Sequence, residues 1–336
     1  MTRSRSLCLS CALFLATLLF ALPSHAATTC SATMTPVNFG TINSTGSTDA
    51  SATVTVTCNS VGLGAQGSVY VRMCLYAGTG SAGAAITPRT MQNGFGDALQ
   101  YNLFREPGFA TIWGDTSGTG IALDLSYPVV LLGGDGSISH TVSARIPIQA
   151  GLAAGSHQSD FNGIHTELRY RYDEPDPALG SIWPASCETG GNGGATGLRL
   201  PFTVSADVLD HCTVGTTTDL DFGAIPGLIR SDHDQTSTIS LSCTRRTAWN
   251  VALSDGQNAV DSTRRMRLGA TGNYVDYALY RNAERTLRWG QTVGSDTETG
   301  TGAGTSQSLT VHGRVAAPQS VPAGHYRDTV IVTLTY

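Results

Sequence analysis

Asp328-Thr-Val-Ile-Val-Thr-Leu-Thr-Tyr336, at the end of the chain, is the stretch that decides the fold, because it alternates as a β-strand does. One face of such a strand carries the apolar side chains Val330, Val332, Leu334 and Tyr336. The other face carries threonine, interrupted only by Ile331. A strand with one apolar face needs a core behind it and a neighbour on each edge. Since nothing follows this strand, we expect another chain to supply the neighbour.

The composition indicates an all-β protein. Glycine accounts for 39 of 336 residues, and threonine, serine and valine are abundant. Short alternating runs such as 52–58 and 237–243 recur between glycine-rich turns, and no long stretch has helical periodicity. The chain has no lysine and a formal net charge of −5, which argues against nucleic acid as a partner. The one basic cluster, Arg264-Arg265-Met266-Arg267, is expected at a solvated strand end.

Residues 1–26 are expected to be a cleaved secretory signal. Two arginines precede an apolar run over 7–22, and Ser24-His25-Ala26 resembles a small-x-small cleavage site. The run is shorter than the about 20 residues that a membrane-spanning helix needs. We therefore expect a secreted chain that begins near Ala27.

Six cysteines remain after this segment: Cys30, Cys58, Cys74, Cys187, Cys212 and Cys243. An even number of cysteines in an exported chain predicts disulfides. Zinc sites favour closely spaced cysteine or histidine pairs, which these spacings do not provide.

The two halves of the chain repeat each other. Cys30-x7-Asn38-Phe-Gly-Thr-Ile42 is followed by Val54-Thr-Val-Thr-Cys58, and Cys212-x8-Asp221-Phe-Gly-Ala-Ile225 is followed by Ile239-Ser-Leu-Ser-Cys243. Further matches follow in the same order, namely Tyr101-Asn-Leu-Phe-Arg105 with Tyr277-Ala-Leu-Tyr-Arg281 and Trp113-Gly114 with Trp289-Gly290. The duplication predicts two domains with equivalent bridges, Cys30–Cys58 and Cys212–Cys243. Cys74 and Cys187 have no counterpart and are left to pair with each other.

We interpret the chain as two immunoglobulin-like antiparallel β-sandwiches in tandem, the C-terminal one lacking its last strand. The pattern leaves a jelly roll or a small barrel open as alternatives. The first domain is expected over 27–195 and the second over 207–336. The segment 196–206 carries Leu198, Leu200, Phe202 and Val204 on one face. It is expected to complete the first domain, although it could instead open the second.

Taken together, these motifs resemble the spore coat protein U family, the pilin-like domain of archaic chaperone–usher pili. A further mark is Pro322-Ala-Gly-His-Tyr-Arg-Asp328 before the terminal strand, whereas Ala154-Gly-Ser-His-Gln-Ser-Asp160 in the first half lacks the proline and tyrosine. The resemblance implies immunoglobulin folds without a seventh strand. It also implies that a periplasmic chaperone, and then the N-terminal strand of an adjacent pilin subunit, fills the gap during assembly by an outer-membrane usher. Val330, Val332, Leu334 and Tyr336 would line one wall of this acceptor groove.

A position at the pilus tip follows from the other terminus. Only Ala27-Thr28-Thr29 would precede Cys30, too few residues for a donor arm. A subunit that accepts a strand but cannot donate one lies at the end of a fibre. We therefore expect a tip adhesin that reaches the cell surface through the periplasm and mediates surface attachment and biofilm formation. A structural spore-coat or matrix protein and a carbohydrate-binding adhesin are the alternatives.

The adhesive surface is expected on apolar loops of the first domain. The candidates are Trp183, Ile182, Phe109 and Leu63, which would contact an abiotic or host surface. Trp113 is expected in the core, because Trp289 repeats it.

We expect no enzymatic activity, cofactor or metal. Asp221-Phe-Gly223 spells a kinase motif, but no glycine-rich loop or strand lysine accompanies it, and its repeat partner Asn38-Phe-Gly40 indicates a turn. The histidines are scattered without metal-ligand spacing. A sugar-processing enzyme would need a pair of carboxylates, and no candidate pair is evident.

Overall fold

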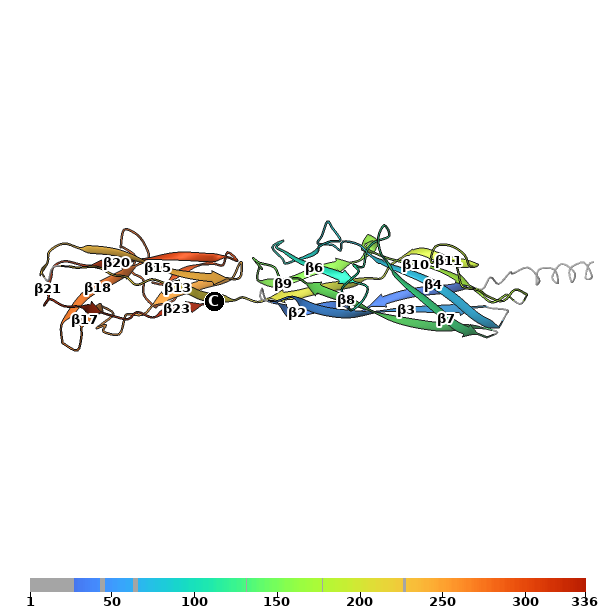
Figure 1. The fold of residues 1–336 in the computed structure, drawn as a ribbon, viewed down its shortest axis with the longest axis horizontal. Coiled ribbons are helices and arrows are strands. Elements are labelled where there is room, and N and C mark those ends of the chain that lie inside the picture. The colour runs from blue at the N-terminus through green and yellow to red at the C-terminus, as the bar shows by residue number, and fades with distance from the viewer. Residues whose placement is uncertain (1–26, 43–45, 63–65, 131, 177, 226–227) are drawn as a thin grey trace, which may run out of the picture.

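The computed structural model describes residues 27–42, 46–62, 66–130, 132–176, 178–225 and 228–336. The described chain is built of β-strands, with one 3-10 turn at Gly163–His165. Two separate hydrophobic cores define a first domain and a second domain, which lie end to end in an elongated molecule (Figure 1). The predicted all-β, two-domain architecture is confirmed. The expected signal segment lies outside the described residues, and within them no helix is long and apolar enough to cross a membrane.

The first domain is a sandwich of two sheets. In spatial order, the eight-stranded sheet contains β1 (Ala27–Met34), β3 (Thr48–Val61), β8 (Gly133–Ile146), β6 (Ala98–Phe104), β5 (Arg89–Gln92), β9 (Gly155–Phe161), β12 (Phe202–Val208) and β2 (Val37–Ile42). The four-stranded sheet contains β11 (Gly193–Leu198), β10 (Thr166–Asp173), β4 (Gly67–Ala77) and β7 (Ile121–Val129). The alternation predicted from sequence is visible in β3, where Val54, Val56 and Cys58 are fully buried and the residues between them are exposed or half-buried.

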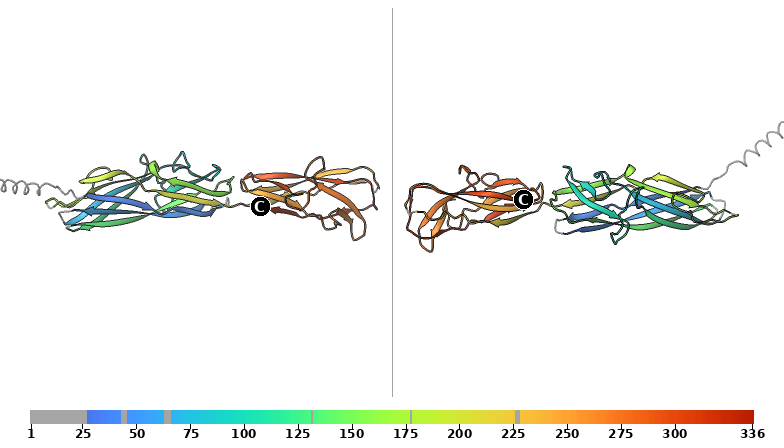
Figure 2. Two further views of the ribbon diagram at one scale, coloured as in Figure 1. Left: turned by 180° about the vertical axis from the view of Figure 1, so that it is seen from behind. Right: turned by 45° about the horizontal axis from the view of Figure 1, so that its top comes forward.

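The second domain repeats this plan with fewer strands. Its larger sheet contains β13 (Cys212–Thr217), β15 (His233–Cys243), β20 (Ser306–Val315), β18 (Tyr274–Tyr280), β17 (Arg264–Leu268) and β22 (Tyr326–Arg327). The facing sheet contains β19 (Glu298–Thr301), β16 (Ala248–Leu253) and β23 (Val332–Thr335), and β14 (Leu228–Ile229) pairs separately with β21 (Gln319–Ser320). The C-terminus lies beside the junction of the domains in every view (Figures 1 and 2).

Three disulfides connect the strands. Cys30–Cys58 joins β1 to β3 and Cys212–Cys243 joins β13 to β15, with Cα–Cα distances of 4.0 and 4.1 Å. Cys74–Cys187 ties β4 to the loop that precedes β11, at a Cα–Cα distance of 5.7 Å. The first two are the pairs that the repeat predicts, because equivalent positions of a duplicated fold face equivalent partners, and the third is the pair left by elimination.

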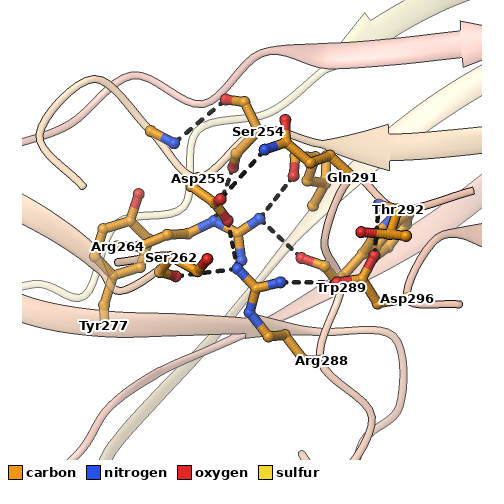
Figure 3. A network of polar contacts seen from close by, with 12 residues as sticks. Ser254, Asp255, Ser262, Arg264, Tyr277, Arg288, Trp289, Gln291, Thr292 and Asp296 are labelled. Carbon is orange, nitrogen blue, oxygen red and sulfur yellow. Dashed lines mark hydrogen bonds and ion pairs between the residues drawn. The ribbon is translucent and has the colours of Figure 1, made fainter. Parts of the chain in front are cut away.

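Arg264 is buried, so the expectation that its cluster marks a solvated strand end was wrong for this residue. Arg264 is 2 % exposed, and its guanidinium donates to the carbonyls of Leu253 and Trp289 at 2.8 Å and of Ser254 at 2.9 Å (Figure 3). Arg288 lies next to it and pairs with Asp255 and Asp296 (Figure 3). The reason is tertiary: main-chain carbonyls from distant strands replace the water that a guanidinium would otherwise need.

The first domain contains the same arrangement. Arg89 is fully buried and donates to the carbonyls of Ala77, Gly78 and Trp113. Burial lowers the pKa of Arg89 to about 10. Trp113 is buried as expected, and its indole nitrogen donates to a carbonyl of β4 at 2.8 Å, as that of Trp289 does to β16 at 2.9 Å. The duplication therefore extends to the polar interior of both sandwiches.

Candidate functional site

The first domain is completed by a segment that follows its last repeated strand. Strand β12 lies between β9, to which it is antiparallel, and β2, to which it is parallel. The preceding strand, β11, pairs with β10 in the facing sheet, where Leu198 is paired with Leu168 and Gly193 with Tyr172. The segment expected to complete this domain therefore does lie in its sandwich, and it extends over 193–208.

The completing segment inserts a row of side chains into the core. Each is at most 6 % exposed: Leu200, Phe202, Val204, Ala206 and Val208. The Phe202 ring stacks on Phe161 at a centroid distance of 4.4 Å and on Trp113 at 5.9 Å. The strand thus supplies both main-chain pairing and core volume.

The equivalent place in the second domain is open. By the repeat, residues 324–330 correspond to β9, and 220–225 correspond to β2. Among the described residues no strand lies between these segments. Instead, a cavity of about 690 Å³ is lined by Ile239, Leu253, Met266, Leu279 and Val311 of the core, together with both flanking segments. A second cavity of about 280 Å³ shares Leu220, Phe222 and Tyr326 with it, so the two form one groove.

Equivalent residues are more exposed in the second domain than in the first, as expected if the slot is open there. Phe39 and Phe161 are at most 6 % exposed, whereas their counterparts Phe222 and Val330 are only half-buried. The second domain therefore presents to solvent the surface that the first domain covers with 193–208.

Only part of the predicted groove wall lines the cavity. Val330 and Val332 do so, whereas Leu334 packs against the core and Tyr336 lies beyond the cavity, 6.1 Å from the His211 ring. Strand β23 pairs with β16 and contacts β13, and Tyr336 after it is exposed outside the groove.

The opposite wall was missed from sequence. Leu220 and Phe222 line both cavities. The signal was present, because Phe222 repeats Phe39 of β2, but the sequence does not show which strand faces β2 across the gap. The duplicated motif was interpreted as a turn, which accounts for Gly223 but not for its apolar neighbour.

Three aspartates, Asp219, Asp221 and Asp328, line the groove, and Asp328 is held by several hydrogen bonds. Asp328 accepts from the Tyr277 hydroxyl at 2.8 Å and from the Gln257 amide and Asn258 side chain at 3.0 Å. Burial, and then the Asp328 carboxylate, raise the pKa of Tyr277. In the first domain the same position is Ser159, which is fully buried under β12. Asp328 thus has hydrogen-bond partners of its own before any strand covers it.

The far end of the first domain carries a set of exposed apolar residues, here named the tip patch. Its members are exposed by 56 to 87 %: Val61, Val130, Leu132, Leu179 and Ile182. They come from three loops that touch. The Gly62 amide donates to the Leu132 carbonyl at 3.3 Å, and the Ser181 hydroxyl donates to the Ser68 carbonyl at 2.6 Å.

The four predicted surface residues are placed differently. Ile182 belongs to the tip patch, and Trp183 beside it is 38 % exposed, with its ring 4.8 Å from that of Tyr70. Phe109 lies elsewhere, half-buried under Arg145, which pairs with the start of β3 rather than with its tip end. Leu63 lies outside the described residues. The Phe109 loop looked like the others because apolar residues without flanking charge do not reveal at which end of a strand they lie.

Within the part of the chain that the structure describes, no three histidine, cysteine or acidic side chains are grouped so as to hold a metal ion. Exposed or half-buried apolar side chains gather at the groove and at the tip patch, and such gatherings commonly mark binding surfaces.

Comparisons with known proteins agree with the duplication. A family model described as "Spore Coat Protein U domain" matches residues 16–162 and again 199–333. "Protein U" of Myxococcus xanthus is 32% identical over 145 residues, which is 39% of this chain and 80% of that protein.

Similar solved structures cover nearly the whole chain at low identity. The chaperone–tip subunit pre-assembly complex CsuC–CsuE of Acinetobacter baumannii is 15% identical, with a TM-score of 0.44, covering 92% of this chain and 100% of that one. The CupB6 tip adhesin of Pseudomonas aeruginosa is 13% identical, with a TM-score of 0.33, covering 91% and 94%. The family match, found in both halves, decides the classification: the chain belongs to the spore coat protein U domain family, and each half carries one such domain.

Proposed function

We propose that the chain is the tip adhesin of a chaperone–usher pilus, which binds a surface through the tip patch and is held in the fibre by a partner strand in the groove. One observation carries this proposal. The first domain fills the slot between β2 and β9 with its own strand, whereas the second domain leaves the equivalent slot open, with core side chains such as Ile239, Leu279 and Val311 in its lining.

The first domain also indicates how a partner strand would lie. By analogy with β12, it would run antiparallel to 324–330 and parallel to 220–225. Every second side chain would enter the groove, and the main chain would pair with both walls. Strand addition of this kind suits the N-terminal arm of an adjacent pilin subunit.

The N-terminal segment of this chain is already engaged. Strand β1 pairs along its whole length with β3, and Ala27 lies opposite Val61 of the tip patch. This end of the first domain is remote from the second domain (Figure 1). Residues 27–34 are thus already paired within the first domain and not free to act as a donor strand, which supports a place at the fibre end.

The open groove accounts for the expected assembly partners. An uncovered apolar slot beside an unpaired strand edge promotes aggregation. A periplasmic chaperone would cover it until an outer-membrane usher exchanges the chaperone for the adjacent subunit. The chain would accordingly reach the cell surface through the periplasm and act without catalysis.

The tip patch supports binding to apolar abiotic surfaces and hence biofilm formation. Its side chains are aliphatic and exposed, and they lie on the end of the molecule opposite the second domain. The tilted Tyr70 ring and the Arg72 guanidinium, 5.7 Å from the ring centroid, already contact Trp183, which leaves less of its ring for stacking on a sugar.

The groove is tested with the whole mature chain. A peptide with the alternating pattern of residues 193–208 should raise the melting temperature of the second domain, and a scrambled peptide should not. No rise with the patterned peptide, under conditions where the chain is folded, would exclude an incomplete second domain.

The location is tested by electron microscopy of pili that carry a label on the first domain. Label at one fibre end is expected. Label distributed along the filament would contradict the tip position and favour a structural coat or matrix role.

A further inference from the structure

The junction between the two domains is held by main-chain contacts as well as by the chain itself. Only residues 209–211 separate β12 from β13. Next to them, Arg245 of the second domain forms a parallel bridge with Ala153 of the first. The Arg245 amide donates to the Leu152 carbonyl and the Ala154 amide donates to the Arg245 carbonyl, both at 2.9 Å. The domains are thus joined twice, once covalently and once by hydrogen bonds.

Asp97 is the ionic centre of this junction. It precedes β6 in the first domain, and its side chain is only 6 % exposed. Two arginines of the second domain converge on its carboxylate: Arg245 Nη1 at 3.1 Å and Arg246 through both Nη2, at 3.2 Å, and Nε. Asn93 of its own turn donates to the same carboxylate at 3.2 Å. The hydrogen bond from Arg246 holds the pKa of Asp97 below its usual range.

Packing around the carboxylate is close. The Arg246 guanidinium lies 4.5 Å from the centroid of the Phe95 ring, a favourable cation–π geometry. On the other side, a Cβ atom on Gly304 would lie 3.0 Å from the Cα of Gly151, so the two backbones approach across the junction without intervening side chains.

Domains that meet through a small polar interface ordinarily move relative to each other. Here, opening the junction would remove both arginines from a largely covered carboxylate and would break the main-chain bridge at the same time. None of these residues belongs to the groove or the tip patch, so neither of the proposed binding functions explains their arrangement. We infer that Asp97, Arg245 and Arg246 form a clamp that makes the two domains one rigid body and fixes the direction of the tip patch relative to the groove.

The test measures a distance between the domains in the full mature chain. Spin labels at the exposed residues Ser51 and Ser308, one in each domain, report the distribution of separations. The native chain should give one narrow distribution. Asp97→Ala should broaden it to about twice the width or more, because inter-domain motion then becomes the default. Arg246→Ala should act in the same direction.

Asp135→Asn is the matched control, since Asp135 is an exposed carboxylate of the first domain. A broad distribution in the native chain, or a narrow one in Asp97→Ala, would overturn the clamp. The variants should also keep the response of the second domain to the patterned peptide, because the clamp residues do not line the groove. The distances are measured without pili, so failure of the clamp and failure of the adhesin function are distinguishable.

Discussion

The two domains have the same fold but differ in one strand, which the first domain contains and the second lacks. In the first domain, β12 covers β2 and β9, and Phe161 is fully buried. In the second, the counterpart Val330 faces a cavity of about 690 Å³. Both domains keep the features that surround this slot, namely a disulfide between their first two paired strands and a buried arginine bonded to main-chain carbonyls. The segment that supplies this strand to the first domain, 193–208, follows β10, the last strand that the two domains share.

The largest loss of stability is expected from damage to β12, the strand that completes the first domain. Val204→Asp would place an unpaired carboxylate where the side chain is fully buried, and it should cost more than about 4 kcal/mol, enough to abolish the folding of the first domain. Secretion yield and the unfolding transition of the first domain measure this. Ser205→Asp, on the opposite face of β12, is the control and should remain folded. A stable first domain in Val204→Asp would show that β12 is dispensable.

The disulfides provide a second test of the difference between the domains, because Cys74–Cys187 of the first domain has no counterpart in the second. Replacing both Cys74 and Cys187 with serine releases a loop of 113 residues, whereas replacing Cys212 and Cys243 releases one of 31. In the chain-entropy model the first change should destabilise its domain by about 5 kcal/mol, about 1 kcal/mol more than the second change destabilises its own. Calorimetry that resolves the two domain transitions measures both losses. A larger loss from the pair in the second domain would contradict this order.

Equivalent substitutions in the two slots should have different consequences. Phe161→Asp should unfold the first domain, whereas Val330→Asp should leave the free chain folded, because its side chain is already half-exposed. The affinity of Val330→Asp for the patterned peptide should nevertheless fall at least about tenfold, or about 1.4 kcal/mol. Peptide titration monitored by calorimetry measures this.

Thr329→Asp is the control for the groove, since its side chain is exposed on the outer face. Equal peptide affinity for Val330→Asp and Thr329→Asp would exclude 324–330 as a wall of the acceptor site.

The smallest effect on stability is expected at the tip. Leu132→Asp with Ile182→Asp should change the free energy of unfolding by less than about 0.5 kcal/mol, because both side chains are more than 70 % exposed. Attachment to hydrophobic plastic should fall clearly, and Trp183→Asp alone should reduce it less. Leu287→Asp, an exposed leucine of the second domain, is the control and should attach as the native chain does. Unchanged attachment in the double variant would remove the tip patch from the binding surface.

Much of the architecture could be predicted from local pattern. Alternation over residues 52–58 and 328–336 predicts strands because successive side chains of a strand point to opposite faces. The duplicated cysteines predict which strands are bridged, because a repeated fold repeats its contacts. Arg264 was predicted wrongly for the complementary reason: charge predicts exposure unless carbonyls from elsewhere in the fold surround the guanidinium, as those of Leu253 and Trp289 do.

The sequence by itself determined that the chain is all-β, duplicated and cross-linked, since these properties depend on period and repetition along the chain. Only the tertiary structure decided that Phe222 faces Val330 across an open groove, that Ile182 joins a patch from which Phe109 is absent, and that Asp97 meets two arginines of the other domain. Each of these depends on strand order and on the meeting of loops remote in sequence. A period of two residues specifies the face on which a side chain lies, but not the segment that lies opposite it.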